Sequence, residues 1–267
     1  MKRSFIFLCA AMVLLSGCGS RTVSSETPSL TVSASAVSVY GRSYVPAQPL
    51  PAKVSTPQEA RAAESALWRC AETPDGQAAL YSPDHSEQVL IQWNGKLAMF
   101  ENWSVSASQD SIPWMVCADL DHSGDDESLI ICAPTVSENG NTLETLHLIQ
   151  MDEHDVFLDQ MLPEALYQEQ LSKLLRVKVR GNSAQLSLDN LSLAVPAGQN
   201  RYTGEASLNE RIQYSIDQSD RLRLELGIGL SVKKVSTPVI GGEILCDISF
   251  DADTSTYTLS NFALGNT

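Results

Sequence analysis

The sequence predicts an α+β protein in which antiparallel β-sheet dominates and two helices pack against it. Three observations lead to this prediction. Short runs of alternating apolar and polar residues recur along the chain, turn signals such as Asn94-Gly95 separate them, and only two stretches show the apolar spacing of a helix. Helix and strand signals alternate without a second flexible linker, so we expect one compact unit rather than two domains divided near Leu162.

The N-terminal residues have the features of an export signal in their usual order. Lys2 and Arg3 precede an apolar run from Phe5 to Leu15, which is too short to cross a bilayer as a stable helix. The next residues, Leu15-Ser16-Gly17-Cys18, resemble the lipobox of bacterial lipoproteins. The resemblance implies that residues 1–17 are a lipoprotein signal peptide and that Cys18 carries the lipid. Two acyl chains would then hold the protein on the extracytoplasmic face of the cell membrane.

Residues 18–51 are expected to be the lipidated cysteine and a flexible tether. The stretch is rich in Ser, Thr, Ala and Val, contains four prolines, and has few large apolar residues. The remaining residues, 52–267, are expected to form the β-rich globular domain.

The charge of the chain limits its partners. Cleavage leaves 250 residues (267 − 17) and changes the formal charge from −14 to −16, because Lys2 and Arg3 are lost. This excess argues against nucleic acid and against electrostatic attachment to anionic lipid, since both are negative themselves. It suits an exported protein that meets divalent cations.

Two helices are expected, over residues 57–71 and 163–175. Thr56-Pro57-Gln58-Glu59 has a capping Thr, a Pro at the first helical position and a Glu that can return a bond to the cap. The apolar stripe of the first helix comprises Ala60, Ala63, Leu67 and Cys70, and that of the second comprises Leu166, Leu171, Leu174 and Leu175.

Strands are expected wherever apolar residues alternate between turn signals. Asn94-Gly95 is the strongest hairpin signal in the chain. The expected strands are 88–93, 96–100, two that flank the acidic loop described next, 143–151, 176–180, 184–188, 191–195, 213–216, 221–232, 242–250 and 257–264.

An acidic loop runs from Asp119 to Glu127, where five carboxylates fall within nine residues between two apolar runs. Oxygen-bearing side chains stand at its positions 1, 3, 5 and 9, and Gly124 allows a sharp turn, an arrangement that suits Ca²⁺. An EF-hand would need a Glu at position 12 and flanking helices. Position 12 is Ile130, inside an apolar run that predicts a strand, so an EF-hand is disfavoured.

Residues 118–131 resemble the D-x-D-x-[DS]-G-x-x-[DE] strand-loop-strand unit of FG-GAP or VCBS-type repeats, as found in integrin-like propellers. The resemblance implies a Ca²⁺ site between two strands and a partial propeller-like unit, since one copy is present. It also implies the ligands: side-chain oxygens from Asp119, Asp121, Ser123 and Glu127, and the backbone carbonyl of Asp125. More loosely, over residues 78–264, the chain is similar to single-loop lipoproteins of gut-dwelling Gram-positive bacteria.

A solvated acidic turn without metal is the alternative. Crowded carboxylates repel one another, and a turn needs only one or two Asp or Gly residues, so this alternative leaves the surplus charge unexplained. We therefore expect a structural Ca²⁺ with a dissociation constant of roughly 0.1–1 mM.

Four cysteines besides Cys18 remain after cleavage: Cys70, Cys117, Cys132 and Cys246. They allow three disulfide pairings, and no C-x-x-C motif supports a zinc or redox site. Cys117 and Cys132 flank the acidic loop, but we favour four small buried residues on strands.

No catalytic residue is predicted. The usual hydrolase signatures are absent, and the histidines are scattered, which favours surface or strand-edge positions. Trp68, Trp93, Trp103 and Trp114 could stack on sugars, although core packing is the commoner role. The expected function is a non-catalytic binding or envelope role with an unknown protein or glycan partner. The alternative is a carboxylate-dependent hydrolase that acts on envelope glycan or peptide.

Overall fold

Strands dominate the computed structural model, which describes residues 28–34, 38–83, 87–103, 105, 111–120, 128–137, 139–181, 183–196 and 201–266. Strands account for 59% of the protein, mostly in antiparallel sheets, and there is one substantial helix. The prediction of a mainly antiparallel β fold is therefore confirmed, whereas the α+β description with two packed helices overstated the helical part. Within the described residues no propeller is found.

The elements follow in chain order. They are β1 (Leu30–Ser33), β2 (Val39–Tyr40), β3 (Arg42–Ser43), α1 (Pro57–Ala62), β4 (Leu67–Glu72), β5 (Ala78–Pro83), β6 (Gln88–Trp93), β7 (Lys96–Glu101), β8 (Trp114–Ala118), β9 (Ser128–Val136), β10 (Thr142–Met151), β11 (Phe157–Asp159), α2 (Glu164–Leu174), β12 (Leu175–Arg180), β13 (Ser183–Leu188), β14 (Leu191–Pro196), β15 (Tyr202–Ile216), β16 (Leu222–Val232), β17 (Val239–Asp251) and β18 (Thr256–Gly265).

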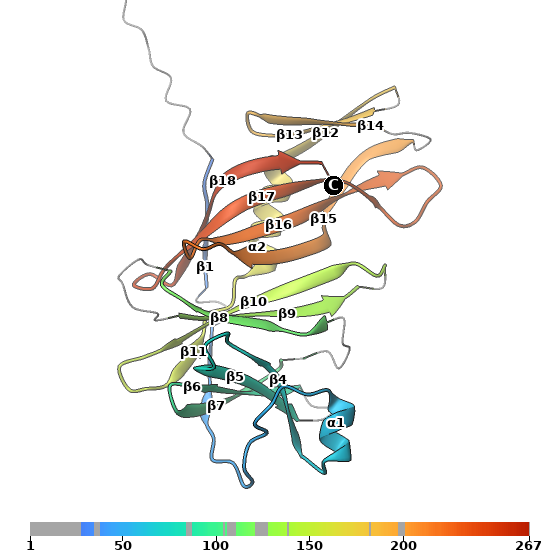
Figure 1. Cartoon of the computed structure of the whole chain (residues 1–267). Helices are drawn as coiled ribbons and strands as arrows, with labels where there is room; N and C mark the ends of the chain where they lie inside the picture. The colour runs from blue at the N-terminus through green and yellow to red at the C-terminus, as the bar shows by residue number, and fades with distance from the viewer. Residues whose placement is uncertain are drawn as a thin grey trace, which may run out of the picture.

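Three sheets are stacked along the molecule (Figure 1). The ten-stranded main sheet has the order β1-β18-β17-β16-β15-β10-β11-β2, and β9 and then β8 extend it from the other edge of β10. The N-terminal sheet has the order β3-β7-β6-β5-β4, and the outer sheet has the order β12-β13-β14. Among the described strands, β10 and β15 form a parallel pair, through Leu143 and Ile212, and the other ladders are antiparallel.

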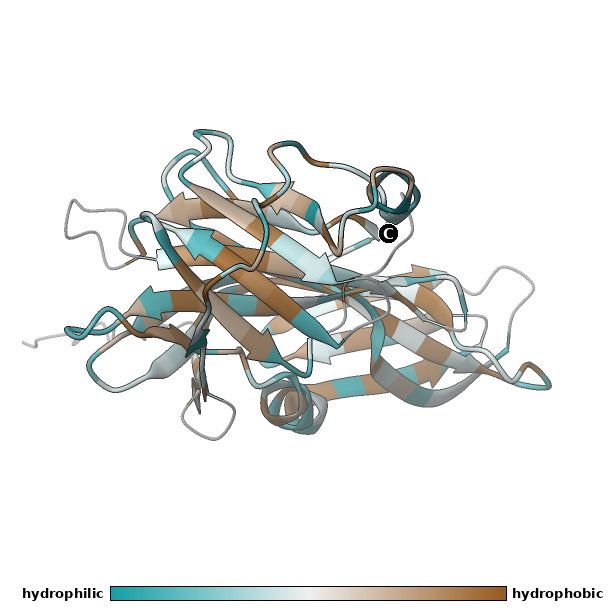
Figure 2. Ribbon diagram, turned by 90° about the horizontal axis from the view of Figure 1, so that it is seen from below, coloured by the Kyte–Doolittle hydropathy of each residue, from teal (hydrophilic) through white to brown (hydrophobic). Residues whose placement is uncertain are grey.

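Strand β9 lies between two hydrophobic cores. Its residues Ile130 and Cys132 belong to the larger core, which α2, the outer sheet and the long C-terminal strands complete. Leu129 and Ile131, which point to the opposite face, belong to the core shared with the N-terminal sheet. Figure 2 shows brown, hydrophobic stretches along the strands at the centre of the molecule. A continuous apolar run is what a strand covered on both faces requires.

The outer sheet and α2 cover one face of the main sheet. Ala184, Leu186 and Leu188 of β13 are buried in the larger core, as are Tyr167 and Leu171 of α2. Contacts from β12 reach β15, and contacts from β14 reach β17 and β18. Helix α2 leads directly into β12, so the helix and the outer sheet form one layer.

Residues 39–43 join the main sheet to the N-terminal sheet. Strand β2 pairs with β11 in the first, and β3 pairs with β7 in the second. Between them, the Gly41 N–H donates to the carbonyl of Phe157 at 2.8 Å. A Cβ at this position would lie 2.7 Å from Cζ of Phe100, so the close crossing requires glycine.

The first predicted helix is shorter than expected. The capping box is present, because Glu59 N–H donates to Thr56 Oγ1 at 3.2 Å and Thr56 N–H donates to Glu59 Oε2 at 2.7 Å. The helix nevertheless ends at Ala62, and Glu64 adopts a left-handed φ of 55°. Residues 67–72 form β4 instead, so the prediction of helix over 63–71 is wrong. The period-2 burial of Trp68 and Cys70 outweighs the helical spacing.

The prediction of a flexible tether over residues 18–51 is wrong for the part of this stretch that the structure describes. Leu30 and Val32 are buried, and β1 pairs with β18 from Leu30↔Leu259 to Ser33↔Thr256. The folded domain therefore includes β1, which lies well before the expected boundary at residue 52. A short edge strand needs only two large apolar side chains, which is why the composition of this stretch did not reveal it.

The second helix and the strands predicted from residue 88 onward are confirmed, although several are longer than expected. Strand β15 begins at Tyr202 rather than Gln213. The first part of the strand was missed because register shifts between Tyr202 and Arg211 interrupt the alternation of apolar and polar residues. Strands β5 and β11 were not predicted. Two ladders cross the suggested division near Leu162, since β1 pairs with β18 and β10 pairs with β15.

Ile130→Ala should lower the free energy of unfolding by about 2–5 kcal/mol, because the lost side chain leaves a cavity in a core that cannot collapse around β9. Urea unfolding measures the change. The control, Leu174→Ala, removes a 43% exposed side chain from α2 and should cost less than about 1 kcal/mol. Equal costs for the two variants would contradict the central position of β9.

Candidate functional site

The acidic loop joins two neighbouring antiparallel strands. Ala118, the last residue of β8, pairs with Ser128, the first residue of β9, and Cys117 pairs with Leu129. Strands on both sides, rather than helices, exclude an EF-hand. Asp119 follows β8 directly; the other predicted ligands, Asp121, Ser123, Asp125 and Glu127, lie outside the described residues, as does Cys18.

The pairing of Ala118 with Ser128 fixes the two ends of the loop about 5 Å apart. A chain of polar side chains secures Ser128 further. Its hydroxyl accepts from Gln150 Nε2 at 3.3 Å, and Gln150 Oε1 accepts from Gln160 Nε2 at 2.6 Å. Ser128 and Gln160 are buried. The base of the loop is therefore attached to β10 and to the residue that follows β11.

A second buried polar cluster lies beside this chain. Asp159 Oδ2 is 2.7 Å from His147 Nδ1 and accepts from Trp103 Nε1 at 3.2 Å. The rings of Trp103 and His147 lie 3.6 Å apart between centroids. All three side chains are buried, and none of them lines a hollow in the described part of the molecule. The cluster joins three segments of the core and has no access to a substrate.

Sequence reasoning missed this cluster. His147 was expected at the surface or at a strand edge, but β10 is covered on both faces there, so the imidazole is buried. The signal was present in the apolar neighbours Leu146, Leu148 and Ile149, which occupy both faces of the strand. Asp159 and Trp103 are 56 residues apart and gave no local signal.

Two glutamates have raised pKa values: Glu164, the first residue of α2, and Glu144 on β10. Burial raises the pKa of Glu164 from 4.5 to about 7, and a hydrogen bond from Thr145 opposes this only in part. Burial also raises the pKa of Glu144, although its Oε2 accepts from the backbone N–H of Tyr214 at 2.6 Å. The hydroxyls of Tyr214 and Tyr167 lie 3.3 Å apart, and burial raises the pKa of both.

Several surface hollows are formed by described residues. One of about 520 Å³ lies between β3, β7 and the β10–β11 turn, and the ion pair of Lys96 with Asp155 is at its rim. One of about 430 Å³ lies at Glu164, and one of about 300 Å³ lies around Pro46. Each is lined by at most one carboxylate. The paired carboxylates that a glycosidase needs, roughly 5–10 Å apart, are not found in these hollows.

Cys70, Cys132 and Cys246 are free thiols that are buried on strands. Cys117 is half-buried and packs against the core opposite to that of Cys132, so these two do not face each other. Burial raises the pKa of Cys246 to about 12 and that of Cys132 well above its usual range. These two thiols are therefore protonated at neutral pH and unreactive.

The tryptophans pack mainly in the core. Trp68, Trp93 and Trp103 are buried, whereas Trp114 is half-buried and packs against the larger core. His154 is exposed beside Glu153. Within the described ranges, no group of three or more His, Cys, Asp or Glu side chains could hold a metal ion.

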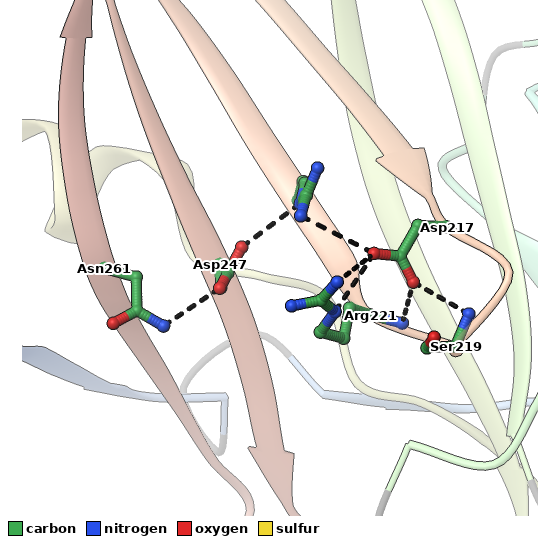
Figure 3. A network of polar contacts seen from close by, with 6 residues as sticks. Asp217, Ser219, Arg221, Asp247 and Asn261 are labelled. Atoms are coloured by element: carbon green, nitrogen blue, oxygen red, sulfur yellow. Dashed lines mark hydrogen bonds and ion pairs between the residues drawn. The ribbon is translucent and has the colours of Figure 1, made fainter.

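Strands β16, β17 and β18 and the turn before β16 carry a network of charged side chains whose positive and negative charges balance (Figure 3). Asp217 accepts from Arg221 Nε at 3.0 Å and from the Ser219 N–H at 2.8 Å. Arg223 lies between Asp217 and Asp247, at 3.5 Å and 3.3 Å, and Asn261 donates to Asp247 at 2.9 Å. Such exposed pairs orient side chains but add little stability.

In comparisons with known proteins, no family model, curated protein or solved structure matched the chain. None of the helices in the described residues is long and apolar enough to span a membrane.

Glu164→Gln should make the protein more stable at pH 8. A carboxyl whose pKa is 4.5 unfolded and about 7 folded binds more protons in the native state between these values, so its contribution to stability falls as pH rises through this range. Because the group is partly exposed, we expect a gain on the order of 1–2 kcal/mol at pH 8 and almost none at pH 4.

Urea unfolding of both proteins across this pH range measures the difference, and comparison with the wild type removes the contribution of Glu144, whose pKa shift has the same sign. Parallel stability profiles for variant and wild type would show that Glu164 titrates normally.

Proposed function

We propose that this chain is a lipid-anchored extracytoplasmic protein whose β-rich domain is stabilised by one Ca²⁺ and has a non-catalytic binding or envelope role. The lipid anchor rests on the charged start, the apolar run and the lipobox that ends at Cys18. The metal site rests on the spacing of oxygens in the acidic loop and on the strands that hold it.

The observation that carries the proposal is the closed hairpin of β8 and β9. The loop of nine residues between Ala118 and Ser128 contains five carboxylates, and Ala118 and Ser128 pair directly across the ladder. Five carboxylates in so short a stretch of sequence are expected to repel one another unless a cation offsets their charge. Ca²⁺ takes six to eight oxygens at roughly 2.3–2.6 Å, and this loop is rich in them.

The same hairpin supports the finer proposal of a propeller-like unit. Strands β8, β9 and β10 form an antiparallel meander, with the acidic loop between the first two. This arrangement corresponds to the strand-loop-strand order of the FG-GAP or VCBS-type repeat that residues 118–131 resemble. A single unit, built into a larger sheet, would serve as a structural clip.

The hollows favour the non-catalytic function over the hydrolase alternative. A carboxylate-dependent hydrolase needs two carboxyl groups across a cleft that admits substrate. The described hollows offer Asp155, already paired with Lys96, or Glu164 alone. The buried Asp159–His147 pair has no access to a substrate.

Millimolar Ca²⁺ should raise the melting temperature of the mature chain, and Asp121→Ala should abolish the rise. For a dissociation constant of roughly 0.1–1 mM, about 5 mM Ca²⁺ stabilises by about 1–2.3 kcal/mol, or roughly 2–9 °C. Differential scanning calorimetry with Ca²⁺ and with a chelator measures the shift. Asp253→Ala, in the β17–β18 turn, removes an exposed aspartate elsewhere and should keep the full rise. Identical curves in Ca²⁺ and in chelator would exclude the metal site.

Cys18 should be the site of acylation. In a bacterial host fed labelled palmitate, the wild type should incorporate the label and Cys18→Ser should not. Cys9→Ser is the matched control, since Cys9 lies in the apolar run that cleavage removes, and it should leave the label unchanged. Label on the Cys18→Ser protein, or its absence from the wild type, would refute the anchor.

A further inference from the structure

The outer sheet presents a basic face to solvent. In β12, Leu175, Val177 and Val179 alternate with Arg176, Lys178 and Arg180. The first set contributes Leu175 and Val177 to the larger core, so the second set points away from the molecule. All three basic side chains are exposed.

The strands beside β12 add no acid to this face. Arg176, Lys178 and Arg180 pair across the ladder with Ser187, Gln185 and Ser183 of β13, and these pair in turn with Ser192, Ala194 and Pro196 of β14. The outward face of the outer sheet is thus three rows of three residues. It carries three positive charges and no negative one, in a chain with 32 acidic and 18 basic residues.

Three further basic residues lie next to this face, at the ends of β15 and β16. A Cβ on Gly204 would lie 3.8 Å from Cγ2 of Val179, which places the start of β15 beside the end of β12. Arg201 precedes β15, and its carbonyl accepts from the N–H of Lys233 at 2.8 Å. Arg201, Lys233 and Lys234 are exposed. We call these three and the β12 residues together the basic face.

The side chains of the basic face differ from the other arginines on the sheets in their partners. Arg211 pairs with Glu243 at 2.6 Å, and Arg221 and Arg223 pair with aspartates in the network of Figure 3. Within the described ranges, no ion pair joins a member of the basic face to an acidic side chain, and Arg176 bonds to backbone carbonyls. The exposed acidic neighbours are Glu205 on β15 and Asp189 in the β13–β14 turn. Residues 182 and 197–200, which adjoin the face in sequence, contain no acid.

The chain enters the fold at the same end of the molecule. Leu30 pairs with Leu259, and β1 runs toward Thr256, so residue 28 lies toward the C-terminal end of β18. That end adjoins the outer sheet, because a Cβ on Gly242 would lie 3.0 Å from Leu193 of β14 and 3.2 Å from the carbonyl of Gly265. Figure 1 shows the beginning of β1 on the side of the outer sheet.

The distance to the anchor is therefore short. Ten residues separate Cys18 from residue 28 (28 − 18), and they span at most about 36 Å when fully extended. A lipid on Cys18 would hold the end of the domain that carries the outer sheet close to the bilayer.

We propose that the basic face docks on the anionic lipid headgroups of the membrane that holds Cys18, so that the domain has a fixed orientation on the bilayer. The inference rests on the proposed lipid attachment for the nearness of the membrane. Clusters of four to eight Lys and Arg near a membrane bind anionic lipid, and each adds to the attraction.

The net charge of the chain does not prevent this contact. Charges farther than a Debye length of about 8–10 Å from the membrane surface are largely screened, so acidic side chains beyond that distance contribute little repulsion. The Ser and Gln side chains of β13 and β14 on the outward face of the outer sheet can also donate hydrogen bonds to phosphate oxygens. Anchor and face together would act as two attachments, which makes even a weak second contact effective.

Vesicle cosedimentation tests the proposal. The protein is residues 18–267 with Cys18→Ser and no lipid, which retains every described helix and strand. We expect the partition coefficient on phosphatidylcholine vesicles with about 30 mol% phosphatidylglycerol to exceed that on phosphatidylcholine alone roughly tenfold or more. The binding should fall as NaCl rises from about 50 to about 300 mM, because screening weakens it.

The matched variants separate the basic face from overall charge. Lys178→Glu with Arg180→Glu should lower binding to anionic vesicles roughly tenfold or more. Lys53→Glu with Arg61→Glu makes the same change in charge beside and within α1, at the opposite end of the molecule (Figure 1), and should lower binding by less than about twofold. Both pairs are exposed, and unchanged melting temperatures show that the folds are intact.

Three results would overturn the proposal: equal binding to neutral and anionic vesicles, equal losses in the two double variants, or binding to soluble polyphosphate with none to vesicles. Because the vesicle assay uses the unlipidated chain, its failure leaves the acylation of Cys18 untouched. Palmitate labelling decides that separately.

Discussion

The burial of β9 on both faces is the constraint on which the rest of the structure depends. Ile130 and Cys132 must be covered from one side, and Leu129 and Ile131 from the other. The N-terminal sheet supplies one cover, and α2, the outer sheet and the long C-terminal strands supply the other. Two cores that would otherwise be separate are thus joined through β9 and its neighbours β8 and β10, which also contribute residues to both cores. Because β9 also begins where the acidic loop ends, the loop grows from the most fully buried part of the fold.

Buried polar side chains in this interior connect neighbouring strands. The pair of Asp159 with His147, and the chain from Ser128 through Gln150 to Gln160, hold β9, β10 and the segment after β11 in a single register. A buried polar group without a partner is costly, so each of these contacts penalises a shifted ladder. Burial is not compensated everywhere, since Asp159 Oδ1, Gln160 Oε1 and Glu164 Oε1 are buried without a hydrogen-bond partner, and burial raises the pKa of Glu164 to about 7.

The sequence predicted the later strands well because each shows period-2 alternation between turn signals, and the capping box of Thr56 and Glu59 predicted the start of α1. It failed where local pattern and tertiary context disagree. The stripe through Leu67 and Cys70 fits a helix, but the left-handed Glu64 ends it. Strand β1 is too short to stand out. Asp159, His147 and Trp103 meet only in the folded chain. The alternation of Arg176, Lys178 and Arg180 was visible, but the absence of acid beside them depends on the register with β13 and β14.

The edge position of β1 has a consequence for the order in which the molecule can assemble. Its partner is β18, the last strand of the chain, and more than two hundred residues separate Val32 from Tyr257. A chain synthesised from its N-terminus therefore holds β1 without a partner until all the other strands exist. Closing so long a loop costs entropy before any ladder bond repays it. The segment nearest to Cys18 is thus the last to gain its native pairing, and joining the two ends of the chain completes the main sheet.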